Sequence, residues 1–132
     1  MSFDVSVLSS NLRNATVADI MSVNKIIRKV KNSRCCILFG KLDLSSVVVR
    51  CYSDASFNNL PNGGSQGGYI IFLEDNKGRC CPVEWRSNKI KRVVRSALAA
   101  ESLACDDVTD ACVFWAGALC EILPRRSIPK RL

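Results

Sequence analysis

The order of apolar and polar positions along the chain predicts three strands followed by a long helix. Residues 47–57 are rich in β-branched and aromatic side chains, which is typical of a strand. Residues 67–74 and 79–86 predict two more strands, joined by a tight turn at Asp75–Gly78. Short links between three successive strands predict an antiparallel meander. Residues 96–123 are rich in Ala and Leu and predict a helix.

The first third of the chain predicts a connection-like segment, residues 1–46, rather than part of the sheet. We expect residues 1–15 to be irregular and a helix to cover about residues 17–31. Thr16 is placed to cap that helix, with Asp19 at its third position. A short strand is expected at about residues 35–39. Residues 47–123 then form the main domain, and the basic tail 124–132 is expected to be disordered.

The apolar stripe of the long helix contains one charged residue, Glu101. At about 100° per residue, the stripe consists of Ala97, Glu101, Ala104, Cys105, Val108, Ala111, Cys112, Trp115, Leu119 and Ile122. A second carboxylate, Asp54, ends the apolar run of the first strand. A carboxylate that faces a core is costly unless it is paired, protonated or bound to a cation. The two could share a metal ion; alternatively, Glu101 is a salt-bridge partner at a frayed helix start.

Charge is distributed unevenly along this chain of net charge +7. Residues 77–95 carry a net +6 and residues 96–123 a net −5. This arrangement suits a polyanion held at its backbone while acidic residues hold metal ions. The alternative is a protein with an uneven surface charge and a solvated basic loop. The candidate backbone contacts are Arg86, Lys89, Lys91, Arg92 and Arg95.

Cysteine and histidine usage excludes several kinds of site. The chain has eight cysteines, no CxxC motif and no histidine, which argues against a zinc centre and excludes a histidine general base. No apolar stretch reaches the length of a membrane span, and the first residues lack the pattern of a signal peptide. We therefore expect reduced cysteines in an intracellular protein, cytoplasmic or nuclear, with no membrane partner.

Four motifs occur in an order that a known family shares. They are Tyr52–Phe57, the Gly-rich stretch Gly63–Tyr69, the segment Trp85–Lys89, and Ser96–Glu101. Together they resemble the ribonuclease H domain of the Pol polyproteins, which also contain reverse transcriptase, of Ty1/copia-type retrotransposons. The helix expected at about residues 17–31 is similar to the segment that joins the reverse transcriptase to its ribonuclease H. The resemblance covers about residues 8–123.

The resemblance implies an α/β ribonuclease H-like fold with a mixed sheet, whose first three strands form an antiparallel meander. It also implies hydrolysis of the RNA strand of an RNA–DNA hybrid by two Mg²⁺ ions, with Mn²⁺ as a possible substitute. The family's first-strand Asp corresponds to Asp54 and its first-helix Glu to Glu101, both catalytic and metal-binding. In the family a fourth strand with a further Asp follows that helix, and here the chain ends at Leu132 where that strand should begin.

The expectation from this comparison is an incomplete, C-terminally truncated ribonuclease H domain that is inactive alone and holds Mg²⁺ weakly. The uncovered edge of the first strand would invite pairing with another chain. Two other interpretations stay open. One is a non-catalytic module that binds nucleic acid or another partner. The other is a gene-model remnant that does not fold stably.

Overall fold

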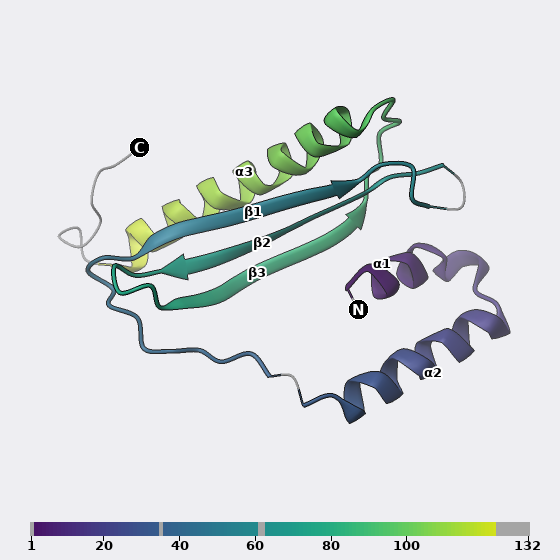
Figure 1. The fold of residues 1–132 in the computed structure, drawn as a ribbon, viewed down its shortest axis with the longest axis horizontal. Helices are drawn as coiled ribbons and strands as arrows, with labels where there is room; N and C mark the ends of the chain where they lie inside the picture. Colours follow the sequence, from purple (N-terminus) through teal and green to yellow (C-terminus); the bar gives the residue numbers. More distant parts are fainter. Residues whose placement is uncertain (1, 35, 61–62, 124–132) are drawn as a thin grey trace.

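A computed structural model describes residues 2–34, 36–60 and 63–123 and has α+β architecture (Figure 1). Three strands form one antiparallel sheet in the order β1-β2-β3, as the sequence predicts. Helix α3 lies along one face of the sheet, and α1 packs beside β3 (Figure 1). The elements are α1 (Ser2–Ser10), the 3₁₀ helix η1 (Leu12–Asn14), α2 (Val17–Asn32), β1 (Val48–Ser56), β2 (Gln66–Glu74), β3 (Cys80–Lys89) and α3 (Ala97–Ile122).

Two predictions for the first third of the chain were wrong. The segment expected to be irregular, residues 1–15, contains α1 and η1. The strand expected at about residues 35–39 does not form in its described part, residues 36–39. Ile37, Leu38 and Phe39 are exposed there. An apolar run needs a neighbouring strand to satisfy its backbone, and the order β1-β2-β3 gives this segment none.

Helix α2 is capped as predicted. The Thr16 side chain accepts from the Asp19 N–H, and the Asp19 carboxylate accepts from the Thr16 N–H at 2.8 Å. Hydrogen bonds from the backbone and then the side chain of Thr16 hold the pKa of Asp19 below its ordinary value. No residue of α2 is buried, so this helix is held mainly by local contacts. The expected tail, residues 124–132, lies outside the described residues.

The buried stripe of α3 is rotated relative to the predicted one. Ala100, Ala104 and Val108 are its buried positions, whereas Ala97 and Cys105 are exposed. Small side chains face the sheet because α3 approaches β2 closely. A Cβ added at Gly67 would lie 3.5 Å from the Cβ of Ala104. Glu101 is therefore at the margin of the interface, half-buried, rather than at its centre.

A partly buried hydrogen-bond network joins α3 to the sheet. The Glu84 carboxylate accepts from the Tyr69 hydroxyl at 2.5 Å and from the Trp115 indole N–H at 2.7 Å. These two bonds, from Tyr69 first, lower the pKa of Glu84 below its ordinary value. Burial, and then the bond to Glu84, raises the pKa of Tyr69. The network ties β2, β3 and α3 at one point beside the core residue Ile71.

Loss of the indole donor should destabilise the helix–sheet contact. We expect Trp115→Phe to lower the free energy of unfolding by about 2 kcal/mol, because the ionised Glu84 loses a hydrogen bond in a partly buried site. The matched control is Trp85→Phe, at a residue that is 51% exposed; it should change stability by less than about 0.5 kcal/mol. Urea unfolding measures both variants. Equal losses would show that the Glu84 network does not anchor α3.

The turn between β2 and β3 is built around the buried carboxylate of Asp75. It accepts hydrogen bonds from the N–H groups of Asp43, Lys77 and Arg79, and it pairs with the Arg79 guanidinium at 2.6 Å. Burial alone would raise the pKa of Asp75, but these donors outweigh it and hold the pKa far below the ordinary range. Gly78, with φ of 73°, closes the turn in a conformation that favours glycine.

The free energy of unfolding should therefore fall in acid as Asp75 becomes protonated. Because the pKa of Asp75 is lower in the folded state than in the unfolded chain, its contribution is complete above about pH 4. It is lost as pH falls from there towards the folded pKa. We expect Asp75→Asn to lower the melting temperature at neutral pH by on the order of 10 °C and to flatten the fall in stability below about pH 4. Asp106→Asn, at an exposed position of α3, is the control, and an unchanged acid slope in Asp75→Asn would contradict this prediction.

Candidate nucleic-acid interface and the two carboxylates

Four of the five predicted basic residues come together where β3 ends. We call Arg86, Lys89, Lys91 and Arg92 the basic strip. All four line a hollow of about 250 Å³ between the end of β3 and the middle of α3. All four are exposed, and the Arg86 guanidinium also interacts with Tyr69 and Glu84. The first residues of the basic loop predicted after the third strand, residues 87–89, belong to the sheet, because Lys89 still pairs with Gln66 of β2.

The Gly-rich loop lies beside the basic strip and forms a second hollow with it. Gly63, Gly64 and Ser65 line a second hollow of about 260 Å³ together with residues 89–94. The Ile90 N–H donates to the Ser65 carbonyl at 2.8 Å, which fixes the strip against this loop. Gly63 has a φ of 71°, so the loop turns in a conformation that favours glycine. Cations beside a glycine-rich backbone suit the phosphate oxygens of a nucleic acid.

Two acidic neighbours change the charge around the basic strip. Asp106 and Asp107 line the first hollow, so that hollow is not purely basic. The second hollow has no acidic residue among those that line it. Arg95, the fifth predicted contact, is exposed but lines neither hollow. The second hollow is therefore the more favourable place for a phosphate.

Strand alternation determines which way Asp54 points. Asp54 pairs with Gly68, and Ala55 pairs with Gly67. A Cβ on Gly67 would touch Ala104 of α3, whereas a Cβ on Gly68 would meet the Arg86 carbonyl and Ser87 instead. Because successive residues of a strand face opposite sides, Ala55 faces α3 and Asp54 faces away from it. Asp54 is exposed there.

Glu101 lies in the second turn of α3. The start of α3 lies near the end of the sheet where β1 ends (Figure 1). The structure thus brings together the two elements that carry the predicted carboxylates. It does not bring Asp54 into the interface between β1 and α3, where Glu101 is half-buried. The alternation of β1 puts Ser53 and Ala55, not Asp54, on the α3 face, so a metal ion shared by Asp54 and Glu101 stays a prediction.

This arrangement does not fit a pair of Mg²⁺ ions. Two ions that assist one displacement lie about 3.5–4 Å apart, so the carboxylates that hold them must converge on one face. Here one carboxylate lies on the outer face of β1 and the other at the margin of the opposite face. Within the described parts of the chain, no three acidic, cysteine or histidine side chains gather closely enough to hold a metal ion.

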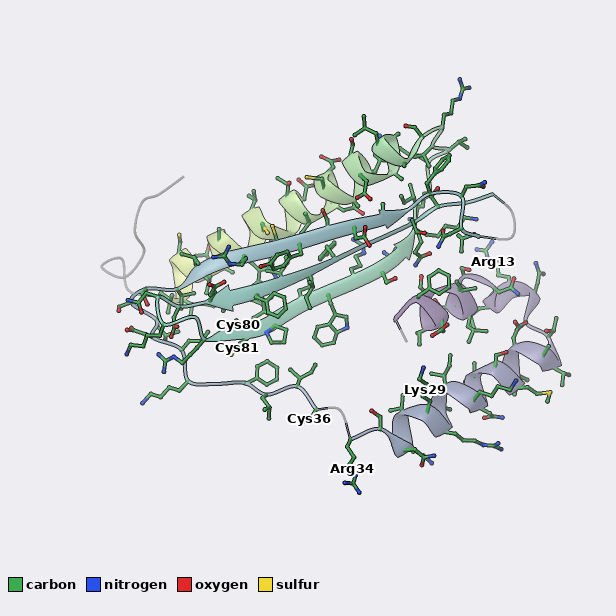
Figure 2. All side chains as sticks on the ribbon, viewed as in Figure 1. Arg13, Lys29, Arg34, Cys36, Cys80 and Cys81 are labelled. Atoms are coloured by element: carbon green, nitrogen blue, oxygen red, sulfur yellow. The ribbon has the colours of Figure 1, made fainter. Side chains whose placement is uncertain are left out.

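Comparisons with protein-family models, with curated proteins and with solved structures gave no match to this chain. None of the described helices is long and apolar enough to cross a membrane. All the described cysteines are free thiols. Figure 2 shows Cys80 and Cys81 at the start of β3 and Cys36 on the extended segment that precedes the sheet.

Sequence reasoning missed two features of this site. The first is the contact between the Gly-rich loop and the basic strip. The sequence could have indicated it, because the loop comes directly before the strand that pairs with β3, where the strip begins. The second is Glu84, the single acidic residue between Lys77 and Arg95. An isolated acid inside a strand with apolar neighbours could have indicated a buried, hydrogen-bonded carboxylate.

Proposed function

We propose that this chain is a ribonuclease H-like domain that binds the sugar–phosphate backbone of nucleic acid, an RNA–DNA hybrid in particular, and does not cleave it. The observation that carries the proposal is the convergence of Lys89, Lys91 and Arg92 on both hollows beside the Gly-rich loop, with Arg86 lining the first of them. The order of three antiparallel strands and a helix, with the motif residues Asp54 and Glu101 on β1 and α3, supports the ribonuclease H-like ancestry.

The charge arrangement favours backbone contacts over base contacts. The strip is short, and its side chains are long cations, which pair with phosphate without reading sequence. No described residue that lines either hollow has an aromatic side chain that could stack on an unpaired base. Trp85 and Tyr52 are exposed, but Trp85 lies on the sheet face away from α3, and neither residue lines either hollow. Binding is thus expected to depend on charge and on duplex shape.

The test is a titration of the chain onto a labelled RNA–DNA hybrid, followed by fluorescence anisotropy between about 50 and 200 mM salt. Four phosphate contacts predict that the association constant falls about a hundredfold over this range. Hybrids of unrelated sequence should bind equally well. An association constant that does not respond to salt, or that differs strongly between sequences, would overturn the proposal.

Catalysis is the second candidate function, and the geometry does not favour it. The family resemblance implies a metal-dependent nuclease, with Asp54 and Glu101 as ligands and Mg²⁺ or Mn²⁺ as cofactor. Asp54 lies on the face of β1 away from α3, the helix that carries Glu101, whereas this chemistry needs both ligands on one face. We accordingly propose that a Mg²⁺ or Mn²⁺ ion, if bound, is held weakly and by only one carboxylate of the chain.

A further inference from the structure

The two edges of the sheet differ in how they are protected. The β3 edge carries Pro82, which cannot donate a backbone hydrogen bond, and its ladder has a register shift near Ile71 and Phe72. Helix α1 also packs against β3. Each of these features hinders the addition of another strand. The β1 edge has a regular register over nine residues with β2, no proline, and no described element on its outer side.

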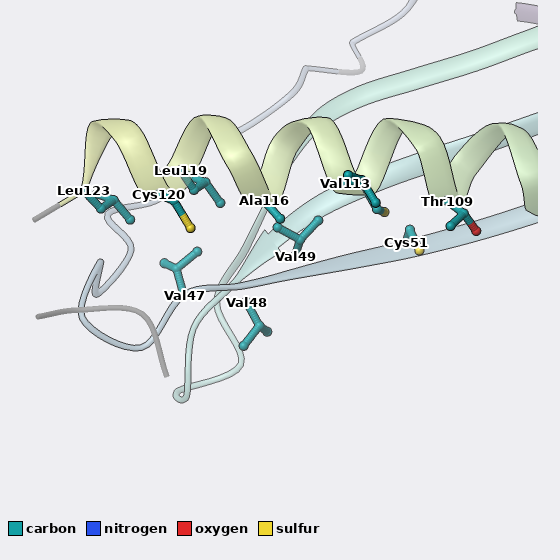
Figure 3. A pocket seen from close by; sticks show the side chains of 11 residues that line it. Val47, Val48, Val49, Cys51, Thr109, Val113, Ala116, Leu119, Cys120 and Leu123 are labelled. Carbon is teal, nitrogen blue, oxygen red and sulfur yellow. The ribbon is translucent and has the colours of Figure 1, made fainter. Parts of the chain in front are cut away.

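An apolar groove runs beside this open edge. It has a volume of about 480 Å³ and lies between the first half of β1 and the second half of α3 (Figure 3). Val49 and Cys51 project into it from β1, Val47 from the position just before β1, and Val113 and Cys120 from the helix (Figure 3). Among the described residues, no charged side chain lines it. Such a surface is usually covered in a folded protein.

We propose that a second copy of this chain covers the edge and the groove, through antiparallel pairing of β1 with β1 of the partner subunit. In this register Tyr52 of each chain lies opposite Tyr52 of the other. The interface is isologous, so each copy supplies the same surface. The proposal goes beyond nucleic-acid binding and does not depend on it.

Charge complementarity selects this register. Arg50 and Asp54 stand two residues on either side of Tyr52 and share its face of the strand. With Tyr52 at the symmetry axis, Arg50 lies opposite Asp54 of the partner subunit, and Asp54 lies opposite Arg50 of the partner subunit. Opposite charges directly across two strands are favourable, and like charges are unfavourable. A shift of the partner by two residues would instead bring Arg50 opposite Tyr52 or Ser56, neither of which carries a charge.

Both charged groups can accept this contact. The Arg50 guanidinium donates to the Glu74 carboxylate through Nε and Nη2, which leaves Nη1 for a second carboxylate. Half of the Arg50 side chain is exposed. Within the described residues, no cation forms an ion pair with Asp54, so the partner subunit would supply the only one. Two such pairs form for each dimer because of the symmetry.

The symmetry also places the helices correctly for covering the groove. A two-fold axis perpendicular to the sheet keeps both copies of α3 on the same face. Since α3 packs over β1 and β2, the two helices would lie side by side across the joined strands. Small residues on the groove side of α3, such as Ala116, allow a close approach of two helices.

The test is the oligomeric state of the 132-residue chain, measured by analytical ultracentrifugation. We expect a dimer. Asp54→Arg places two like-charged pairs in the interface, because each new Arg lies opposite Arg50, and should raise the dissociation constant at least about tenfold. Asp107→Arg makes the same charge change on α3, beside the basic strip, and should leave the dissociation constant unchanged. A chain that stays monomeric up to about 100 µM, or an equal effect of both variants, would overturn the proposal.

Cysteine cross-linking tests the register directly. In a Cys51→Ser background, Tyr52→Cys should form a disulfide between the two introduced thiols, one from each copy, on mild air oxidation with oxygen as the electron acceptor. Val48→Cys lies on the same face of β1 with similar exposure, but its counterpart in the partner would be about 27 Å away, so it should not link. Peptide mapping identifies the linked residues. Linkage at position 48, or at neither position in a dimer, would exclude this register.

Discussion

Replacement of Lys89, Lys91 and Arg92 by alanine should reduce the affinity for an RNA–DNA hybrid on the order of a hundredfold at about 50 mM salt. These three residues line both hollows of the interface, and they are held against the Gly-rich loop by the Ile90–Ser65 hydrogen bond. The slope of log K against log salt should also become shallower by about three, because each lost cation removes one phosphate contact.

The control removes the same charge elsewhere. Lys25, Lys29 and Lys31 are exposed on α2, which packs on α1 and stands apart from the sheet (Figure 2). Their replacement by alanine lowers the net charge equally but leaves the strip intact. If both triple variants lose the same affinity, binding reflects the overall charge of the chain. The basic strip would then have no special role.

Cleavage of the hybrid should be absent or very slow. We expect the 132-residue chain to hydrolyse the RNA strand at least about a thousandfold more slowly than an active ribonuclease H, since loss of the paired-metal clamp removes several kcal/mol of transition-state stabilisation. The physical reason is the position of Asp54 on the face of β1 away from α3. Single-turnover assays with excess chain, in Mg²⁺ and separately in Mn²⁺, measure the rate.

Asp54→Asn is the control that separates the chain's own activity from contamination. Trace cleavage that persists in Asp54→Asn comes from another nuclease. Fast cleavage in the unchanged chain that disappears in Asp54→Asn would show that Asp54 reaches a metal together with Glu101 or another ligand. The proposal of a binding domain without catalysis would then be wrong.

The sheet and α3 could be predicted because the residue types in each element suit both its secondary structure and its packing. β1 is β-branched where it packs, and α3 is rich in Ala where it approaches Gly67. Helix α1 was missed because four of its nine residues are serine, which is a weak helix former. The end of β3 was missed because Ser87–Lys89 has no apolar residue. The strand structure of this end comes from pairing with Gln66–Gly68 of β2.

The direction in which the Asp54 carboxylate points could not be predicted from the sequence alone. The pattern located Asp54 near the end of a strand and Glu101 on an apolar stripe, and both elements are present. Which side chains of β1 face α3, however, depends on how the helix packs on the sheet. That contact is set by Gly67 and Ala104, far apart in the sequence. The basic strip was easier to predict, since its residues are close together along the chain.

The most direct test of the proposed interface is hydrogen–deuterium exchange of the chain with and without an RNA–DNA hybrid. We expect slower exchange on binding at the backbone amides of residues 63–65 and 86–92, which form the two hollows. Residues 17–32 of α2 and the outer turns of α3 should exchange at unchanged rates. Protection confined to α2, or no protection in the basic strip under conditions where the hybrid is bound, would contradict the proposed function.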